Sequence, residues 1–229
     1  MSYKYETHLH TSPVSKCAVA TVEETVRSYH ELGYDGIFIT NHFLDGNCAA
    51  EIKEMSYEDG MRAYISDYRR AKALGDELGL KVFFAVELSY DGTDFLVFGL
   101  DEEWYIAHPE ILGMTKKEEL AFMAGEGALI IHAHPFREAR YIDHIRLYPR
   151  EVEGVEVVNG SRRELENRMA GIYCREYGLI PFAGSDNHAG GRFENFAGME
   201  CDEPVSSVAE FVDAVRSGRA RPFYTRLEK

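Results

Sequence analysis

The sequence is short of paired cysteines, of long apolar runs and of basic charge. Its four cysteines, Cys17, Cys48, Cys174 and Cys201, are widely spaced and form no C-x-x-C motif, so we expect neither a thiolate zinc cluster nor a disulfide framework. No apolar run approaches the roughly 20 residues that span a bilayer, and the first residues lack the pattern of a secretory signal. These absences predict a soluble, cytoplasmic protein with no membrane partner.

The charge balance is strongly acidic, with 39 Asp and Glu against 25 Lys and Arg and a formal net charge of −14. Because nucleic-acid backbones are bound by basic surfaces, we do not expect an extended nucleic-acid interface. A small anionic substrate is still compatible, since bound cations can reverse the local field. The 229 residues, 45% of them apolar, predict one domain over residues 1–229. The oligomeric state is left open.

Short apolar runs rich in β-branched and aromatic residues alternate with longer helical patterns. Thr21, Thr115 and Ser207 each precede a glutamate by three residues, which predicts capping boxes at three helix starts. The alternation predicts a mostly parallel sheet, open or closed into a barrel, with a lid or loop at 43–57 over one face. Strands are expected at 3–10, 36–40, 81–88, 95–99, 128–133, 154–158 and 179–184, and helices near 22–33, 58–79, 116–125, 137–147, 162–177 and 208–217.

Histidines gather at the ends of these predicted strands. Alternate strand residues share a face, so His8 and His10 should point together, as should His132 and His134. A single strand histidine is more often a hydrogen-bonded core residue, but here six of nine histidines fall at strand ends together with two carboxylates. The converging set is His8, His10, His42, Glu87, His132, His134, Asp186 and His188, whereas His30, His108 and His144 lie elsewhere.

Burying so many imidazoles and carboxylates without a cation would leave polar groups competing for too few partners. Mixed imidazole and carboxylate ligands suit zinc, manganese or iron, and the set is too large for one ion. The sequence therefore predicts a multinuclear site holding two to three divalent transition-metal ions.

Six motifs in chain order, HLHTS, ITNHF, VELS, AHPFR, EVVNG and GSDNH, resemble the polymerase-and-histidinol-phosphatase (PHP) domain over nearly the whole chain. The resemblance implies an α/β fold, a distorted, TIM-barrel-like (β/α)7 barrel, with a trinuclear metal centre at the strand ends and phosphoesterase activity. It also implies the metal ligands. His8, His10 and Asp186 would hold the first metal, Glu87 would bridge the first and second, His134 would bind the second, and His42 and His188 would bind the third.

Three positions depart from the family pattern. Asn41 stands where an outer-shell aspartate is usual, and this change would alter metal affinity or the pKa of a bound water. Asp94 stands near a usual histidine of the second metal, and it is either an oxygen ligand or a strand-start carboxylate that faces water. Lys16 is a poor ligand for the third metal, so either Cys17 ligates there, as the alternative to a buried inert thiol, or the third site is weak.

Further side chains are predicted to act around the metals. His132 would orient a ligand or a water from one pleat deeper, unless it is a hydrogen-bonded core histidine. Asn159 would orient backbone or ligands, and Glu156 is expected to be structural or to support a ligand. Arg137 and Arg192 are the preferred phosphate-binding cations, ahead of Arg162 and Arg163, with solvent-exposed cations as the alternative for each.

The predicted reaction is hydrolysis of a small phosphate monoester, with histidinol phosphate the best-known family substrate, by attack of a metal-bridging hydroxide. Asp186, His188 or a metal-bound water would protonate the leaving group. Alternatives are a nucleotide or oligonucleotide phosphoesterase, a metal-dependent hydrolase of a carbonyl ester or amide, and a degenerate domain whose metals only stabilise the fold.

Overall fold

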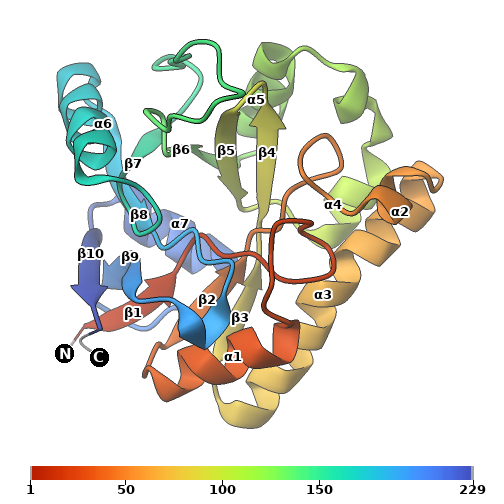
Figure 1. Ribbon diagram of the computed structural model, residues 1–229, viewed down its shortest axis with the longest axis horizontal. Coiled ribbons are helices and arrows are strands. Elements are labelled where there is room, and N and C mark those ends of the chain that lie inside the picture. Colours follow the sequence, from red (N-terminus) through yellow and green to blue (C-terminus); the bar gives the residue numbers. More distant parts are fainter. Residues whose placement is uncertain (1, 228–229) are drawn as a thin grey trace.

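The computed structural model describes residues 2–227, whose strands form two five-stranded sheets (Figure 1). The first sheet has the strand order β10-β9-β1-β2-β3, and the second has the order β4-β5-β6-β7-β8. The strands are β1 (Tyr3–Glu6), β2 (Gly36–Ile39), β3 (Lys81–Phe84), β4 (Val86–Tyr90), β5 (Thr93–Phe98), β6 (Leu129–Ala133), β7 (Gly154–Asn159), β8 (Ile180–Gly184), β9 (Asn195–Cys201) and β10 (Ala220–Arg226).

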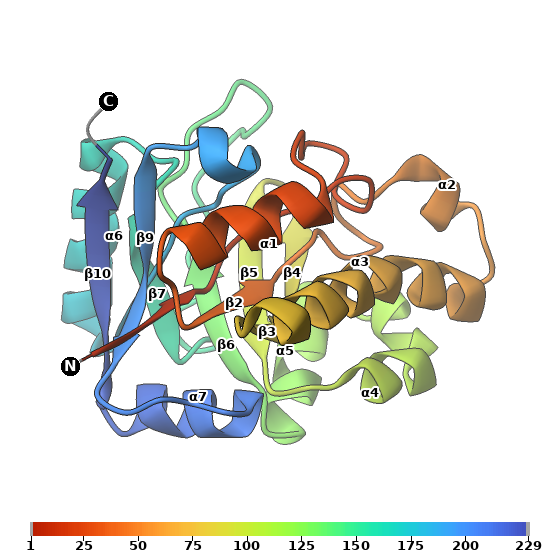
Figure 2. The same cartoon turned by 90° about the horizontal axis from the view of Figure 1, so that it is seen from below.

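Helices cover the sheets from outside, and α1 and α3 lie side by side against β2 and β3 (Figure 2). In α1, Val22, Val26 and Tyr29 recur at helical spacing and pack against the apolar side chains of β2 and β3. The helices are α1 (Val22–Glu31), α2 (Ala50–Lys53), α3 (Tyr57–Leu78), α4 (Glu102–Ala107), α5 (Lys116–Gly125), α6 (Glu164–Tyr177) and α7 (Val208–Arg216), with short 3-10 helices η1 (Pro109–Gly113) and η2 (Gly190–Arg192).

The sheets are mixed rather than mostly parallel. Strands β1, β2 and β3 are parallel, as are β6, β7 and β8, but β4, β5 and β6 pair antiparallel. The Asp91-Gly92 turn, with both residues at positive φ, closes the β4–β5 hairpin that the sequence analysis missed. The missed strands β9 and β10 also pair antiparallel, and Gly198 lets β9 approach β1 because a Cβ there would lie 2.2 Å from the Tyr5 carbonyl oxygen.

The predicted strand at 81–88 is divided between the two sheets at Ala85. The Ala85 amide donates to the Ile39 carbonyl at 3.1 Å, and isolated bridges join His42 to Glu87 and Leu9 to Asn187. The sheets therefore meet at their margins, but the predicted closed seven-stranded barrel is not confirmed.

The space between the sheets is filled at one end by α7. The Phe211 ring contacts Tyr5, Phe38, Phe98 and Phe182, which belong to β1, β2, β5 and β8. These rings come from both sheets, so burial of one helix face ties the two sheets to each other.

Most predicted helices are present with nearly the predicted bounds. Thr21 and Thr115 form complete capping boxes, whereas Ser207 caps α7 alone because the Glu210 carboxylate accepts from Ser206 instead. The segment 43–57, predicted as a lid or loop, contains α2. Asp45 of this segment lines the cavity that also holds His42, Glu87 and His188.

The predicted helix at 137–147 is wrong. The segment is irregular and is held by bonds to distant residues in place of the helical i→i−4 pattern. Arg146 Nη1 donates to the Asp91 carbonyl at 2.9 Å, and the Glu138 amide donates to Glu166 Oε1 at 3.2 Å.

Glu6 ends β1 and binds the segments on either side of it. Its Oε1 accepts from the amides of Thr7 (3.0 Å), His8 (2.9 Å) and Ser185 (2.9 Å), and its Oε2 accepts from Tyr29 Oη (2.7 Å) and Ser185 Oγ. These bonds turn the chain inward after β1, so the predicted strand at 3–10 ends before His8.

No helix among residues 2–227 is long and apolar enough to cross a membrane. The cytoplasmic location and the single domain over residues 1–229 stay predictions.

Replacing Glu6 tests the importance of this buried junction. Glu6→Ala leaves three buried amides without their acceptor, and we expect the free energy of unfolding to fall by about 3 kcal/mol or more. Glu6→Gln keeps one carbonyl oxygen for these amides and should lose less. Chemical denaturation measures both, and an alanine variant as stable as the parent would contradict this account.

Candidate metal centre

The predicted ligands meet at one end of the sheets although they are far apart in the chain. His8 and His10 are 0% and 1% exposed, and the other ligands line a cavity of about 580 Å³ above them. The pair His8 and His10 follows β1, His42 follows β2, Glu87 lies in β4, Asp94 lies in β5, His134 follows β6, and Asp186 and His188 follow β8.

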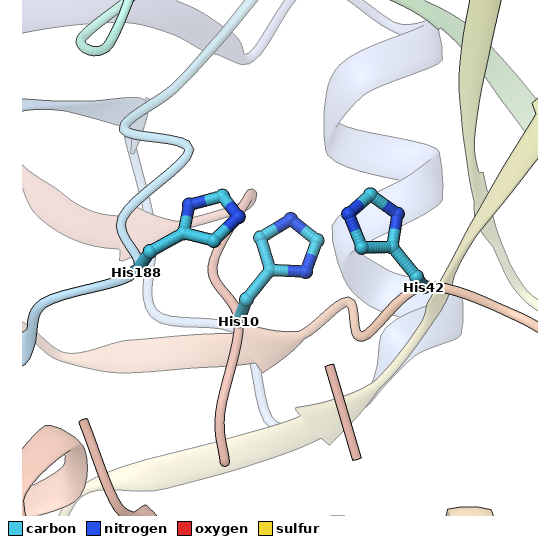
Figure 3. A group of neighbouring side chains, drawn as sticks. All are labelled: His10, His42 and His188. Carbon is cyan, nitrogen blue, oxygen red and sulfur yellow. The ribbon is translucent and has the colours of Figure 1, made fainter. Parts of the chain in front are cut away.

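Four overlapping triads of these side chains have ligand atoms close enough to share a cation. The atoms of each triad lie within 4.8 Å of one another. Figure 3 shows the outermost triad, in which the His10 ring lies between His42, at a centroid distance of 4.4 Å, and His188, at 4.3 Å. The triads are His8-His10-Glu87, His8-His134-Asp186, Glu87-Asp94-His134 and His10-His42-His188.

The free atoms at the centre of the cluster fit divalent cations. The Nε2 atoms of His8 and His10 and both carboxylate oxygens of Glu87 are buried and have no hydrogen-bond partner among the described residues. His8 Nε2 lies 3.1 Å from Glu87 Oε1, and His10 Nε2 lies 3.3 Å from Glu87 Oε2. Buried polar atoms that converge without hydrogen bonds are what a set of metal ligands leaves in the free protein.

The far nitrogens of these two imidazoles are held by other side chains. His8 Nδ1 lies 2.9 Å from Glu156 Oε1, and His10 Nδ1 lies 3.0 Å from Ser15 Oγ. Such contacts fix the ring orientation and direct Nε2 to the centre. Glu156 Oε2 also accepts from the His134 amide at 3.0 Å and from Asn159 Nδ2 at 2.9 Å, so Glu156 contacts two of the predicted ligand residues and Asn159 contacts Glu156.

Gly184 makes room for the His8–Glu156 contact. A Cβ at this position would lie 2.4 Å from His8 Cβ and 2.7 Å from Glu156 Oε1. The sequence analysis assigned no role to Gly184, Ser15 or Glu6, and only the glycine had a signal, since it stands directly before the SDNH segment.

His132 and His134 do not share a face, contrary to the prediction. His134 follows β6 with φ at +27°, which turns its ring into the cavity. His132 stacks on Phe95 at 5.1 Å and contacts Tyr148 and Tyr173, and neither of its ring nitrogens has a hydrogen-bond partner among the described residues. Its environment is thus an aromatic cluster, so no contact supports the predicted role in orienting a ligand.

The charges of the central groups depend on one another. Burial alone would lower the pKa of His8, but the Glu156 and Glu87 carboxylates raise it well above its ordinary value. Burial would raise the pKa of Glu87, yet His42 and His8 hold it well below the ordinary range. Burial and the neighbouring His188 and His42 lower the pKa of His10. The centre therefore favours an ionised Glu87 surrounded by imidazoles.

Asp94 is 3% exposed and lines the cavity, so it is not a strand-start carboxylate facing bulk water. Its Oδ2 lies 3.7 Å from His134 Nε2 and 3.3 Å from Arg137 Nη1. Asp94 thus forms one of the triads, together with Glu87 and His134, and its role as a metal ligand stays a prediction.

Two of the four candidate arginines line the cavity. Arg137 and Arg162 line it, and Arg162 Nε is buried without a hydrogen-bond partner among the described residues. Arg192, preferred over Arg162 in the sequence analysis, instead directs its guanidinium to the backbone carbonyls of Ala189 and Val19, both at 3.4 Å. Arg163 is paired with Glu166 and Glu138.

Asn41 and Cys17 occupy the other side of the cluster. Asn41 Oδ1 accepts from the Thr11 amide at 2.7 Å and from Ser15 Oγ at 2.9 Å. Asn41 is thereby linked to His10 through Ser15, whose Oγ lies 3.0 Å from His10 Nδ1. Cys17 Sγ lies 3.0 Å from His188 Nε2. Burial would raise the pKa of the Cys17 thiol, but the adjacent His188 and His42 lower it to about 6.

Comparison with known proteins supports the resemblance. No curated protein sequence matches the chain. Residues 164–220, which include Asp186 and His188, match the family described as PHP-associated.

Solved structures share the fold over almost the entire chain. A two-domain protein of Bacteroides vulgatus containing a predicted PHP-like metal-dependent phosphoesterase has a TM-score of 0.73 at 15% identity, covering 98% of this chain and 65% of that one. PsfC of Pseudomonas syringae has a TM-score of 0.66 at 15% identity, with 99% and 92% covered. An amidohydrolase of Chromobacterium violaceum has a TM-score of 0.57 at 14% identity, with 95% and 97% covered.

The chain spans about two thirds of the two-domain Bacteroides protein and nearly the full length of the other two. Its fold is thus that of PHP-like proteins and its residues 164–220 match the PHP-associated family, which confirms the resemblance that the sequence motifs indicate.

Proposed function

We propose that the protein is a metal-dependent hydrolase that cleaves a small phosphate monoester. The observation that carries this proposal is the buried set of imidazoles and carboxylates directly beneath a cavity lined by Arg137 and Arg162. We call the histidines and carboxylates of the four triads the floor of the cavity, and Arg137 and Arg162 its rim. Cation ligands in the floor and guanidinium groups at the rim together suit an anionic substrate.

Divalent ions bound at the floor would offset charge on the phosphoryl group and activate water for attack. His8, His10, Glu87 and Asp186 would hold the first ion, Asp94 and His134 would join Glu87 at the second, and His42 and His188 would bind the third. Glu156 keeps His8 oriented throughout by its contact with Nδ1.

The rim residues would position the substrate. Arg137 Nη1 donates to Asp94 Oδ2 at 3.3 Å, and this bond holds the guanidinium over the floor. Arg162 lines the same cavity. Two guanidinium groups can bind separate phosphate oxygens and fix the ester bond for in-line attack. A metal-bound water, or Asp186 or His188 where that side chain does not bind an ion, would protonate the departing alkoxide, and both side chains line the cavity.

The cavity of about 580 Å³ suits a small molecule rather than a polymer. Together with the net charge of −14, this size favours a compact monoester such as histidinol phosphate over an oligonucleotide. A carbonyl ester or amide stays the competing bond, because one of the similar structures is an amidohydrolase and the same floor can activate water toward carbonyl carbon.

A substrate panel tests the proposal. The protein is stripped with a chelator, reloaded separately with zinc, manganese or ferrous iron, and assayed with histidinol phosphate, an aryl phosphate, a nucleoside monophosphate, a short oligonucleotide, an aryl acetate and an anilide. We expect metal-dependent phosphate release from a small monoester, inhibited by inorganic phosphate. Turnover confined to the acetate or anilide would replace the phosphatase assignment with a carbonyl hydrolase.

Removing one central imidazole should abolish turnover. His10→Ala takes away a shared metal ligand, so we expect kcat to fall by at least roughly 100-fold and the bound metal to decrease. His132→Phe is the matched control, because this ring lies in an aromatic cluster and should be dispensable. Metal analysis and kinetics are measured on both, and equal activity of His10→Ala and the parent would refute the assigned centre.

Arginine substitutions distinguish the rim from the surface. Arg137→Gln and Arg162→Gln each remove a charge-assisted contact, so kcat/KM should fall roughly 10- to 100-fold. Arg192→Gln should leave kcat/KM nearly unchanged, since its guanidinium is directed to backbone carbonyls outside the cavity. A larger loss in Arg192→Gln than in the other two variants would show that the phosphate binds elsewhere.

A further inference from the structure

The thiol of Cys17 stands at the outer edge of the histidine cluster. Its Sγ lies 3.0 Å from His188 Nε2, and it also contacts the His42 side chain. Cys17 is half-buried and lines the same cavity as both histidines. The three other cysteines are buried in the apolar clusters.

Backbone hydrogen bonds hold Cys17 between the segments that carry the two histidines. On one side, the Lys16 amide donates to the Asn47 carbonyl at 3.0 Å, shortly after His42. On the other side, the Val19 amide donates to the His188 carbonyl at 2.9 Å. The backbone is therefore anchored on both sides of Cys17, at Lys16 and at Val19, so Cys17 does not lie on a free loop.

A second observation marks this edge as a ligand site. His10 is 1% exposed, and its Nε2 has no hydrogen-bond partner among the described residues. Its ring lies between those of His42 and His188, and the three rings offer ligand atoms within 4.8 Å of one another (Figure 3). Cys17 lies beside two of these three rings, with its Sγ 3.0 Å from His188 Nε2 and in contact with His42.

We propose that Cys17 is a thiolate ligand of the third metal, which His42 and His188 would also bind, and that it makes this site prefer zinc over manganese. The inference rests on the proposed function only in assuming that the cluster binds metal. Thiolate with imidazole is a ligand set that zinc favours, whereas manganese is best held by oxygen. On binding, the sulfur–proton bond breaks, the proton passes to solvent and the sulfur lone pair forms the bond to the metal.

Cobalt(II) reports thiolate ligation by its colour. The chelator-stripped protein is titrated with cobalt(II) alone, and the near-ultraviolet sulfur-to-cobalt charge-transfer absorption and the bound cobalt per chain are recorded. We expect the absorption in the parent protein and in the control Cys174→Ser, whose thiol lies on α6 and donates to the Leu179 carbonyl. Cys17→Ser and Cys17→Asp should both lose it.

Two results would overturn the proposal. One is the absence of the absorption from the parent protein when its sites are filled with cobalt. The other is the same absorption in Cys17→Ser and in the parent. Circular dichroism shows whether each variant is folded, so a misfolded variant is not mistaken for loss of a ligand.

Alkylation of the unsubstituted protein gives an independent readout. Iodoacetamide should modify Cys17 in the stripped protein. Zinc added at one ion for each proposed site should abolish this modification, as measured by mass spectrometry of the peptide containing Cys17. Manganese at the same concentration should leave Cys17 reactive. Equal modification with and without zinc would refute the thiolate ligand.

These experiments separate the two proposals. If the absorption appears but no phosphate ester is hydrolysed, the ligand assignment stands and the phosphatase assignment fails. If phosphate is released by a metal-dependent protein that lacks the absorption, the phosphatase assignment stands and Cys17 is not a ligand.

Discussion

One buried carboxylate is the constraint on which the site depends. Glu87 is 0% exposed, and imidazoles of four histidines approach its two oxygens. The nitrogen–oxygen distances are 2.7 Å for His42, 3.1 Å for His8, 3.3 Å for His10 and 3.4 Å for His134. A buried carboxylate is costly unless positive charge surrounds it. The strand ends that carry these histidines must therefore converge on β4, and the two sheets meet where Glu87 lies.

The surrounding polar groups keep this convergence in place. Glu156 contacts His8 from behind and accepts from the His134 amide, while Glu6 binds the amides that follow β1 and β8. A carboxylate that accepts several backbone amides fixes both the chain direction and the side chains beyond it. The orientation of the predicted ligands thus depends on groups that do not line the cavity. Gly184 is one of them, because a Cβ there would collide with His8 and Glu156.

The parts of this arrangement that follow from local chemistry were predictable from the sequence. Hydroxyl and glutamate spacing placed Thr21 and Thr115 at helix starts, and strand-end histidines indicated the cluster. Backbone direction was not predictable from periodicity alone. The positive φ of His134 separates it from His132, and the choice between Arg162 and Arg192 depends on which loop faces the cavity. Such choices are made by contacts between distant segments, which a one-dimensional pattern does not contain.

The floor and the rim of the cavity differ in their chemistry, because the floor offers ligands for cations and the rim offers side chains that could contact a substrate. The histidines and carboxylates could supply cation ligands. Similar folds carry the names of a phosphoesterase and of an amidohydrolase, so the fold leaves the cleaved bond open. The rim is where this chain has its own chemistry, with Arg137 held by Asp94, Arg162 with a free Nε, and Cys17 beside His188. A phosphoryl group presents several charged oxygens and a carbonyl presents one, and this difference is the reason for proposing a phosphoryl substrate beside two guanidinium groups. Under the proposed function, substrate choice would therefore depend on Arg137 and Arg162, whose positions are set by contacts outside the histidine–carboxylate cluster.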